Sequence, residues 1–198
     1  MTNMRSEVGS ADGHRAGPRG LSVRVEALVP AAVADVWDVF VPVDLAMVFP
    51  RAKGPVPSVT GTTGQTGRWD VVGRTRMVHL SDGRAVREEI TGSDPSGGDP
   101  PQGGRARFAY RVHGFTGPFG TLAREARGTW SFEQVAPDST RIVWTYVFVP
   151  TGRLGSLPLR VIVPTFWRAY MRDGLANFCR LIESSQAALR AAGSPATC

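Results

Sequence analysis

The sequence has almost no lysine, few histidines and only two cysteines, and these shortages exclude several kinds of chemistry. Lys53 is the single lysine among 23 basic residues and lies in an irregular segment, so Schiff-base catalysis is not expected. The histidines, at positions 14, 79 and 113, have no metal-ligand spacing. No G-x-S-x-G motif is present, and Cys179 has no histidine nearby in the sequence. We therefore predict no metal, no organic cofactor and no serine or cysteine nucleophile.

The chain also lacks a disulfide framework, a long apolar run and a signal peptide. Cys179 and Cys198 are its only cysteines, which favours a reduced, cytoplasmic setting. No apolar run approaches the roughly 20 residues of a membrane span, and the polar, glycine-rich residues 1–20 lack an apolar core. The 198 residues fit one domain. We predict a flexible tail over residues 1–20, a domain over 21–189 and a second tail over 190–198.

The excess of basic residues does not have the form of a nucleic-acid interface. The formal net charge is +6, and all but one of the basic residues are arginines. These arginines alternate along the predicted strands instead of forming a patch. We therefore expect no nucleic-acid partner. The sequence leaves open whether the chain forms a homodimer.

The longest periodic segment is residues 164–189. Its apolar residues recur every three or four positions, which is the pattern of a helix that lies on a core. Pro164 suits the first turn of such a helix, where its missing N–H is not needed. The predicted buried stripe consists of Phe166, Tyr170, Asn177 and Leu181, with Trp167, Met171, Phe178 and Ile182 beside it.

Most of the chain before this helix has the pattern of β-strands. Apolar residues at helical spacing over 31–40 predict one short amphipathic helix. Glycine- and proline-rich segments at 92–104 and 114–120 predict loops, and the second carries two aromatic residues that suit a lid at a cavity mouth. The predicted strands cover residues 21–29, 56–60, 68–72, 74–80, 84–90, 108–112, 123–135 and 141–149, the last of them near the centre of the sheet. Together these elements predict a curved sheet closed by one long helix.

Residues 74–90 predict a hairpin that turns at Ser81-Asp82-Gly83. A two-residue turn and a three-residue loop both suit these residues, and they give different registers. Only the three-residue loop gathers the apolar side chains of both strands on one face, and register follows the buried face. This register sets Arg76 opposite Glu88, both projecting from the apolar face. The apolar residues gathered there are Val78, Leu80, Val86 and Ile90.

Four segments, in this order, resemble the START-like (SRPBCC) superfamily: VWDVF, VGRTRMVHLSDGRAVREEI, RGTWSFEQV followed by STRIVWTYVF, and the terminal helix. This superfamily has the helix-grip fold of Bet v 1, plant abscisic-acid receptors and the bacterial polyketide cyclase/dehydrase group. The resemblance covers residues 21–189 and implies an α+β fold, in which a curved antiparallel β-sheet wraps around a long C-terminal α-helix, with short helices near the N-terminus. It also implies an internal cavity for a small hydrophobic molecule, often faced by a polar pair on the strands that match TRMVHL and REEI.

Arg76 and Glu88 match that polar pair, and general acid–base chemistry is the mechanism that the residues leave open. Glu88 on an apolar wall can take or give a proton at a carbonyl substrate, Arg76 can hold an enolate or carboxylate oxygen, and Tyr110 can donate a hydrogen bond. The alternative is a cross-strand ion pair that fixes the register and contacts no ligand. The predicted ligand-binding residues are Val78, Leu80, Val86, Phe108, Trp130, Tyr170, Asp173 and Asn177.

Gly174 is unusual because it lies inside the predicted terminal helix, where glycine costs about 1 kcal/mol relative to alanine. Close approach of the helix to a ligand or to a strand would explain it. Asp173 and Asn177, which flank it, are candidates for the cavity wall on this argument; exposed polar residues of a helix are the alternative.

Gly128 suits a β-bulge, and a bulge there would decide whether Glu125 and Arg127 face the cavity. The large aromatic residues are expected to fill the core instead of forming a ligand cage, because aromatic side chains dominate core burial. These residues are Trp144, Tyr146, Trp167 and Tyr170.

These observations support three hypotheses on function. The first is a polyketide cyclase/dehydratase-like enzyme that binds a hydrophobic, oxygenated molecule and promotes cyclisation or dehydration by acid–base catalysis. The second is a non-catalytic carrier or sensor of a lipid-like ligand, and the third is an interaction protein with a filled core. A large cavity that contains Arg76 and Glu88 favours the enzyme, a purely apolar cavity favours the carrier, and a filled interior favours the third.

Overall fold

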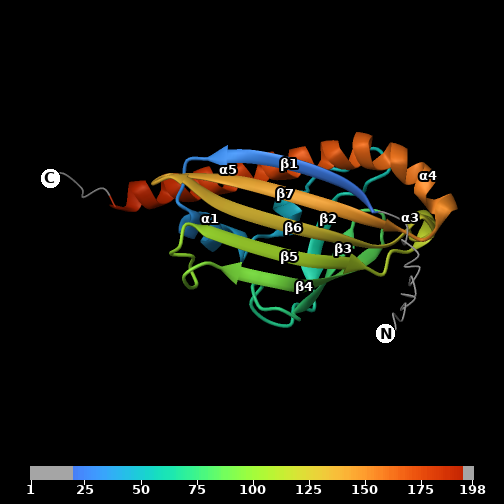
Figure 1. Ribbon diagram of the computed structural model, residues 1–198, viewed down its shortest axis with the longest axis horizontal. Coiled ribbons are helices and arrows are strands. Elements are labelled where there is room, and N and C mark those ends of the chain that lie inside the picture. The colour runs from blue at the N-terminus through green and yellow to red at the C-terminus, as the bar shows by residue number, and fades with distance from the viewer. Residues whose placement is uncertain (1–19, 194–198) are drawn as a thin grey trace, which may run out of the picture.

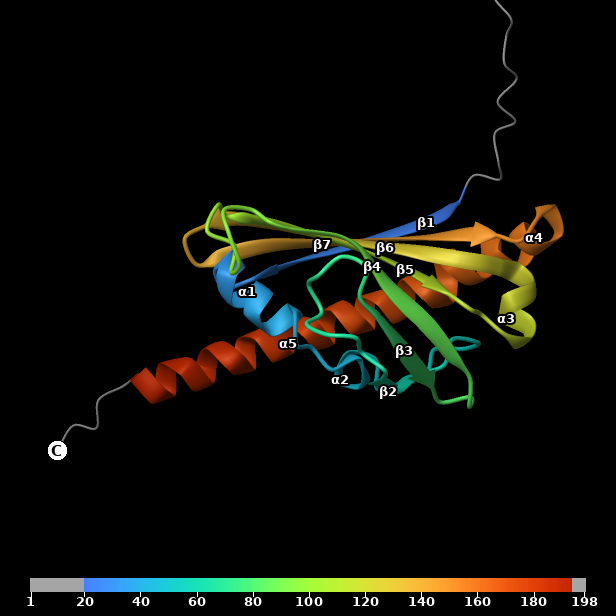
Figure 2. The same ribbon diagram turned by 90° about the horizontal axis from the view of Figure 1, so that it is seen from below.

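The structure is a computed structural model that describes residues 20–193. A seven-stranded antiparallel sheet curves around one long C-terminal helix, with shorter helices at its two ends (Figures 1 and 2). This confirms the predicted α+β helix-grip fold. Residues 1–19 and 194–198 of the two predicted tails, with His14 and Cys198, lie outside the described residues.

The strand order along the sheet is β1-β7-β6-β5-β4-β3-β2, so the first strand pairs with the last. The strands are β1 (Leu21–Val29), β2 (Val59–Thr63), β3 (Thr75–Leu80), β4 (Ala85–Pro95), β5 (Arg105–His113), β6 (Ala123–Ala136) and β7 (Ser139–Pro150). The helices are α1 (Val33–Phe40), α2 (Leu45–Val48), α3 (Gly117–Leu122), α4 (Arg153–Ile162), the π-helical turn η1 (Val163–Trp167) and α5 (Arg168–Gly193).

The strands bury alternate side chains on the concave face, as their sequence pattern predicts. On β7 the buried side chains include Trp144 and Tyr146, while Val143 and Val147 on the other face are half-buried. β7 lies next to the edge strand β1, and not at the centre of the sheet as predicted. The prediction was wrong because the half-buried outer face of β7 has the same apolar residue types as a fully buried one.

α1 fills one end of the space between the sheet and α5. Its four apolar residues are buried as predicted, among them Trp37 and Phe40. The Phe40 ring lies 5.0 Å from the rings of Phe108 and Phe132 and 5.9 Å from that of Phe178, measured between centroids. These aromatic contacts close the α1 end, and α3 and α4 lie at the opposite end (Figure 2).

The C-terminal helix is longer than predicted at both ends. It begins as α4 at Arg153, before the predicted start at residue 164, passes through η1 and continues to the end of α5 at Gly193. Pro164 was predicted in the first turn of the helix, but both Pro164 and Pro158 lie inside the helical segment. Both are exposed, so water can hydrate the carbonyl groups that lose a backbone donor. No helix of the described residues is long and apolar enough to cross a membrane.

Residues 68–72, predicted as a strand, form turns instead. Gly67 and Gly73 bound this segment with φ values of +148° and +86°, a conformation that favours glycine and bends the chain. The turns bring Trp69 into the interior, where it is 3 % exposed. Two further differences are small. β2 begins at Val59 and not at Val56, and the short helix α3 forms within a segment that was predicted as a loop.

Candidate functional site

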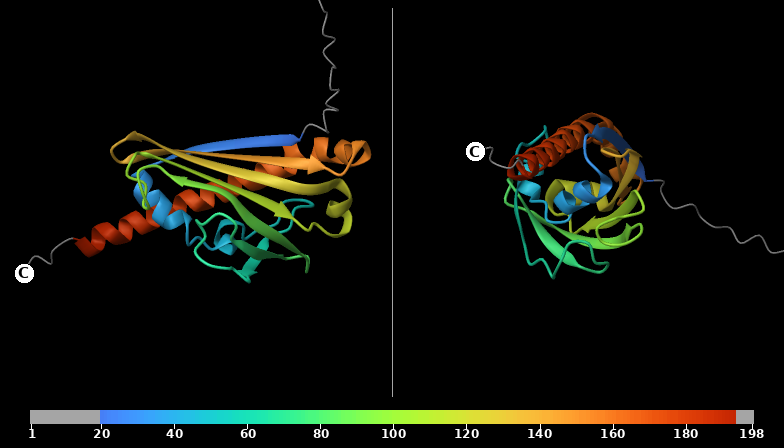
Figure 3. Two further views of the ribbon diagram at one scale, coloured as in Figure 1. Left: turned by 60° about the horizontal axis from the view of Figure 1, so that its bottom comes forward. Right: turned by 90° about the vertical axis from the view of Figure 1, so that its left-hand side faces the viewer.

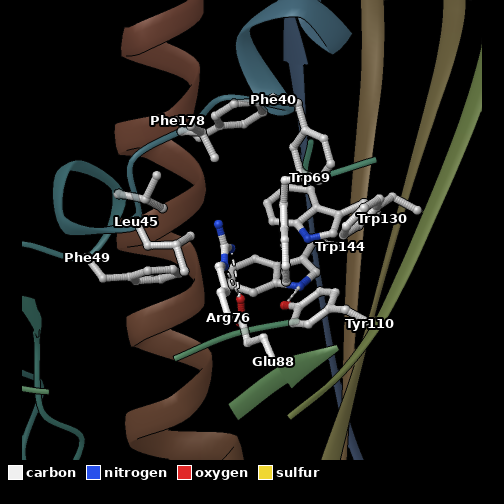
Figure 4. Close-up of a pocket in the computed structure, with 13 residues that line it drawn as sticks. Phe40, Leu45, Phe49, Trp69, Arg76, Glu88, Tyr110, Trp130, Trp144 and Phe178 are labelled. Atoms are coloured by element: carbon white, nitrogen blue, oxygen red, sulfur yellow. Dashed lines mark hydrogen bonds and ion pairs between the residues drawn. The ribbon is translucent and has the colours of Figure 1, made fainter. Parts of the chain in front are cut away.

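A cavity of about 320 Å³ lies between the concave face of the sheet, the C-terminal helix and α3. A smaller pocket of about 60 Å³ lies toward α1 (Figure 4). Glu88, Tyr110 and Trp144 line both spaces. The interior is therefore not filled by side chains, and the polar groups on this shared wall decide what the cavity can do.

Arg76 and Glu88 form a buried ion pair, in which Glu88 lines both spaces and Arg76 lines only the smaller pocket. They lie directly opposite each other on β3 and β4 and are 5 % and 8 % exposed. Arg76 Nε donates a hydrogen bond of 2.8 Å to Glu88 Oε2, and Nη2 lies 2.8 Å from the same oxygen. Glu88 Oε1 accepts no hydrogen bond from another described residue, which leaves it for a ligand. Figure 4 shows both side chains beside Tyr110 and Trp144.

The pair is aligned by the hairpin that joins β3 and β4. Gly83 has a φ of +81°, and Leu80 N–H donates to the Arg84 carbonyl at 2.8 Å, which closes the three-residue loop. Val78 pairs with Val86 in the same register. The predicted register is confirmed.

Trp69 covers the guanidinium group of the pair. The Cζ atom of Arg76 lies 3.9 Å from the Trp69 ring centroid, which is a cation–π contact. Trp69 was not among the predicted site residues, because the pattern of residues 68–72 predicts a strand. A tryptophan between two glycines that break the strand pattern was the signal that could have found it.

Tyr110 presents its hydroxyl group to both spaces from β5. The ring lies over Gly128 of β6, and Trp144 Nε1 donates to the hydroxyl oxygen at 3.2 Å. The hydroxyl group donates to no described residue, so its proton is available to a ligand. Burial, with a contribution from nearby Glu88, raises the pKa of Tyr110 above its ordinary value of about 10 and keeps the hydroxyl protonated.

All three tyrosines of the chain line the larger cavity. Burial raises the pKa of Tyr146 and of Tyr170, so all three are neutral hydrogen-bond donors at physiological pH. The Tyr146 and Tyr170 hydroxyl groups make no hydrogen bond to a described residue. The cavity wall thus combines the Glu88 carboxylate, and that of Asp82 at the hairpin tip, with several donors, which suits a ligand that carries several oxygen atoms.

The predicted apolar ligand-binding residues divide between the two spaces. Val78, Leu80, Val86 and Tyr170 line the larger cavity, and Phe108 and Trp130 line the smaller pocket. The aromatic residues expected in the core also reach the cavity, because Trp144, Tyr146 and Trp167 line it as well.

Asp173 and Asn177, predicted at the cavity wall, lie outside both spaces. The Asp173 carboxylate is exposed and pairs with Lys53 Nζ at 2.6 Å, and Asn177 Nδ2 donates to the Val48 carbonyl at 2.8 Å. The glycine between them faces neither ligand nor strand: a Cβ atom on Gly174 would lie 2.3 Å from the Phe49 ring. The helix does approach another segment closely at Gly174, but that segment is Phe49, the residue that follows α2.

Gly128 is not a bulge. β5 and β6 pair without a register shift there, and a Cβ atom at Gly128 would lie 2.1 Å from the Tyr110 ring, so glycine makes room for that ring. The two register shifts of β6 lie between Ala123 and Glu125 and between Gln134 and Ala136. Glu125 and Arg127 pair with each other on the face opposite buried Ala126, away from the cavity.

At one end of the cavity the tip of the β3–β4 hairpin meets α3. Arg84 pairs with Asp82 at 2.8 Å, and its guanidinium group lies against Gly117, where a Cβ atom would be 2.7 Å from it. The two aromatic residues of the predicted lid segment, Phe115 and Phe119, are half-buried and line the cavity. Among the described residues, no group of three or more His, Cys, Asp or Glu side chains is arranged to hold a metal ion.

Comparison with known proteins gives one family and many similar folds. Residues 20–183 match the family described as polyketide cyclase / dehydrase and lipid transport. No curated protein matches the sequence.

Three solved structures illustrate the similarity in fold. Norcoclaurine synthase of Thalictrum flavum, as a point mutant bound to a transition-state analogue, is 13 % identical over 84 % of this chain and 96 % of that chain, with a TM-score of 0.58. Ara h 8.0201 is 16 % identical over 83 % and 99 %, with a TM-score of 0.60. A protein of Thermus thermophilus is 20 % identical over 83 % and 99 %, with a TM-score of 0.55. At these identities the likeness concerns the fold alone.

Proposed function

The chain belongs to the polyketide cyclase / dehydrase and lipid transport family, and from this premise we propose that it promotes cyclisation or dehydration of a hydrophobic, oxygenated molecule by acid–base catalysis. The observation that carries the proposal is the buried Arg76–Glu88 pair, whose carboxylate lines both spaces and whose guanidinium group lines the smaller pocket. An ion pair that only fixed the register would have no need of a cavity beside it.

The proposed roles follow from the atoms that each group leaves free. Glu88 Oε1 removes a proton from a carbon next to a ligand carbonyl group, and Tyr110 donates a hydrogen bond to the enolate oxygen that forms. The carbanion attacks a second carbonyl carbon of the same molecule and closes the ring. Protonated Glu88 then returns the proton to the alkoxide that forms, which gives a β-hydroxy carbonyl compound. In a dehydration, Glu88 removes a second proton from the carbon between the carbonyl and hydroxyl groups and returns it to the hydroxyl group, which leaves as water while the carbon–carbon double bond forms. Arg76 stabilises the carboxylate before and after these steps, and the hydrophobic wall excludes bulk water.

The test is native mass spectrometry with a panel of aromatic polyketides and fatty acids, followed by product analysis for each bound compound. Glu88→Gln should bind the same compound and lose turnover by about 10²-fold or more, which is the usual range for a general acid or base. Glu89→Gln is the matched control, because Glu89 lies on the same strand and pairs with Arg111 at 2.6 Å on the outer face. Tyr110→Phe is a second variant that keeps the packing of the ring. Full turnover in both Glu88→Gln and Tyr110→Phe would end the catalytic proposal.

A carrier of a lipid-like ligand is the second candidate, and the predominantly apolar wall of the larger cavity favours it. The same panel separates the two. A carrier binds fatty acids and releases them unchanged, and its affinity depends on the apolar wall. Val78→Asp, on β3 beside the pair, should abolish binding in both cases, whereas Glu88→Gln should leave a carrier's affinity within a few-fold.

A further inference from the structure

We propose that the outer face of α4 and η1 is a docking surface for an anionic lipid membrane, because an exposed apolar stripe lies there beside unpaired arginines. The stripe consists of Leu154, Leu157, Val161 and Phe166, which are 86 %, 59 %, 62 % and 38 % exposed. Apolar residues at positions i, i+3 and i+7 of one helix, with cationic residues at its sides, are the pattern of a helix that lies in the membrane interface.

The stripe faces outward because the opposite side of α4 is fixed to the rest of the protein. Leu159 is fully buried, and a Cβ atom on Gly155 would lie 2.7 Å from the Leu122 carbonyl oxygen, so the backbones of α4 and α3 are in close contact. Rotation of the helix to hide the stripe would expose Leu159 and break this contact. The apolar exposure is therefore a fixed property of the surface. The helix α4 that carries most of it lies at one end of the molecule (Figure 3).

The charges around the stripe favour an anionic partner. Arg153, Arg160 and Arg168 are exposed, and none of them pairs with a carboxylate of the described residues. The sequence has no Asp or Glu between Asp138 and Asp173. Lipid head groups with negative charge would neutralise these arginines while the acyl region accepts the stripe.

The same features argue against a second copy of the chain as the occupant. A two-fold contact through the stripe would bring the same three arginines of both copies together without a carboxylate among residues 139–172 to pair with them. Like charges in such a contact oppose association.

The docking surface is continuous with the cavity wall. Ile162 and Trp167 line the cavity from the inner side of the same helical segment. The Phe166 ring packs against Gly54, next to cavity-lining Pro55 and Val56. A membrane on this surface would place the cavity beside the bilayer, where a water-insoluble molecule could enter or leave. This inference does not depend on whether the bound molecule is converted.

The test is flotation of the full-length protein with vesicles of phosphatidylcholine alone and of phosphatidylcholine mixed with phosphatidylglycerol. The variant L154S/L157S/V161S removes the stripe, and R153Q/R160Q removes two charges. The matched control L28S/V72S/L189S replaces three apolar residues elsewhere that are 63 %, 56 % and 60 % exposed. Thermal unfolding and light scattering of each variant report on folding and on oligomeric state.

We expect the wild type to float with the anionic vesicles and not with phosphatidylcholine alone. The stripe variant should lose at least tenfold in partitioning, and R153Q/R160Q should lose more than tenfold, at about fivefold for each arginine near an anionic surface. The control should partition like the wild type. The proposal is overturned if the wild type does not float, if the control loses binding as the stripe variant does, or if the wild type is a dimer that only the stripe variant converts to a monomer.

Discussion

The guanidinium carbon of Arg76 lies 3.9 Å from the ring centroid of Trp69, so the buried cation is held by an aromatic face as well as by a carboxylate. Trp69 lies in the turn segment 68–72 and Arg76 lies on β3, so the two side chains meet only in the folded protein. Trp69 and Arg76 both line the smaller pocket. The contact therefore orients the ion pair from the side of α1, and it gives the first prediction.

Trp69→Leu should destabilise the protein by about 3 kcal/mol, because a large buried side chain is truncated and the cation–π contact is lost. A double-mutant cycle with Arg76→Met isolates the contact. The cost of leaving Glu88 without its partner occurs in both arms of the cycle and cancels. Urea unfolding of the four proteins should give a coupling free energy of about 1 kcal/mol. Additive effects would show that Trp69 contributes packing only.

Glu88→Gln should cost about 3 kcal/mol of unfolding free energy, because it leaves a buried guanidinium group without a charged partner. Replacement of both partners, Arg76→Met with Glu88→Leu, should recover most of that loss, since no unpaired charge remains inside. Glu89→Gln on the outer face should leave the midpoint of unfolding unchanged. If the double variant is less stable than Glu88→Gln, the attraction between Arg76 and Glu88 itself stabilises the fold. The loss in Glu88→Gln would then not result only from an unpaired buried charge.

The ion pair could be predicted from the sequence because its determinants are local. The turn residues at 81–83 and the alternation of apolar residues on both sides leave one register that buries a complete face, and that register sets Arg76 opposite Glu88. The order of most helices and strands could be predicted as well, because the apolar residues of each element recur with the period of a helix or of a strand.

What the sequence did not reveal depends on contacts between distant segments. Trp69 reaches Arg76 only because the chain turns between two glycines. Gly174 makes room for the Phe49 ring and not for a ligand, and the neighbouring Asp173 is exposed and does not line the cavity. The start of the C-terminal helix was missed because a proline on a solvated helix face costs less than its local signal indicates. For Trp69 and Gly174 the residue in contact, and for the prolines the exposure to water, decided the outcome.

Gly128→Ala should displace Tyr110, because the new Cβ atom would lie 2.1 Å from the Tyr110 ring. We expect a loss of about 2 kcal/mol, in the range for inserting a methyl group into a packed site, together with weaker ligand binding. Gly92→Ala is the matched control on β4, where a Cβ atom would lie 3.3 Å from the Ala109 methyl group, a contact that a small shift relieves. Equal stability of the two variants by thermal unfolding would show that the Tyr110 ring is free to move.

The three tyrosines of the chain should titrate abnormally, and because all of them line the cavity, a spectrum of the whole protein reports on the cavity alone. Burial raises the pKa of each above the ordinary value of about 10. In alkaline titration, the phenolate absorbance of the native protein should stay low through about pH 10, and should rise only where the fold is lost. Protein unfolded in guanidinium chloride should show all three ionisations near the ordinary pKa of about 10.

The same shifts fix the direction of the pH dependence. Above about pH 10 the unfolded chain releases phenolic protons that the folded chain retains, so the stabilisation is complete below that pH and declines as pH rises toward the folded-state pKa values. Each tyrosine should contribute a slope of roughly 1.4 kcal/mol per pH unit, or roughly 4 kcal/mol per unit for the three. Tyr146→Phe should remove about one third of the slope. Reversible ionisation of the native protein near the ordinary tyrosine pKa, with no loss of near-ultraviolet circular dichroism, would mean that water solvates these hydroxyl groups and that the cavity is wetter than its burial indicates.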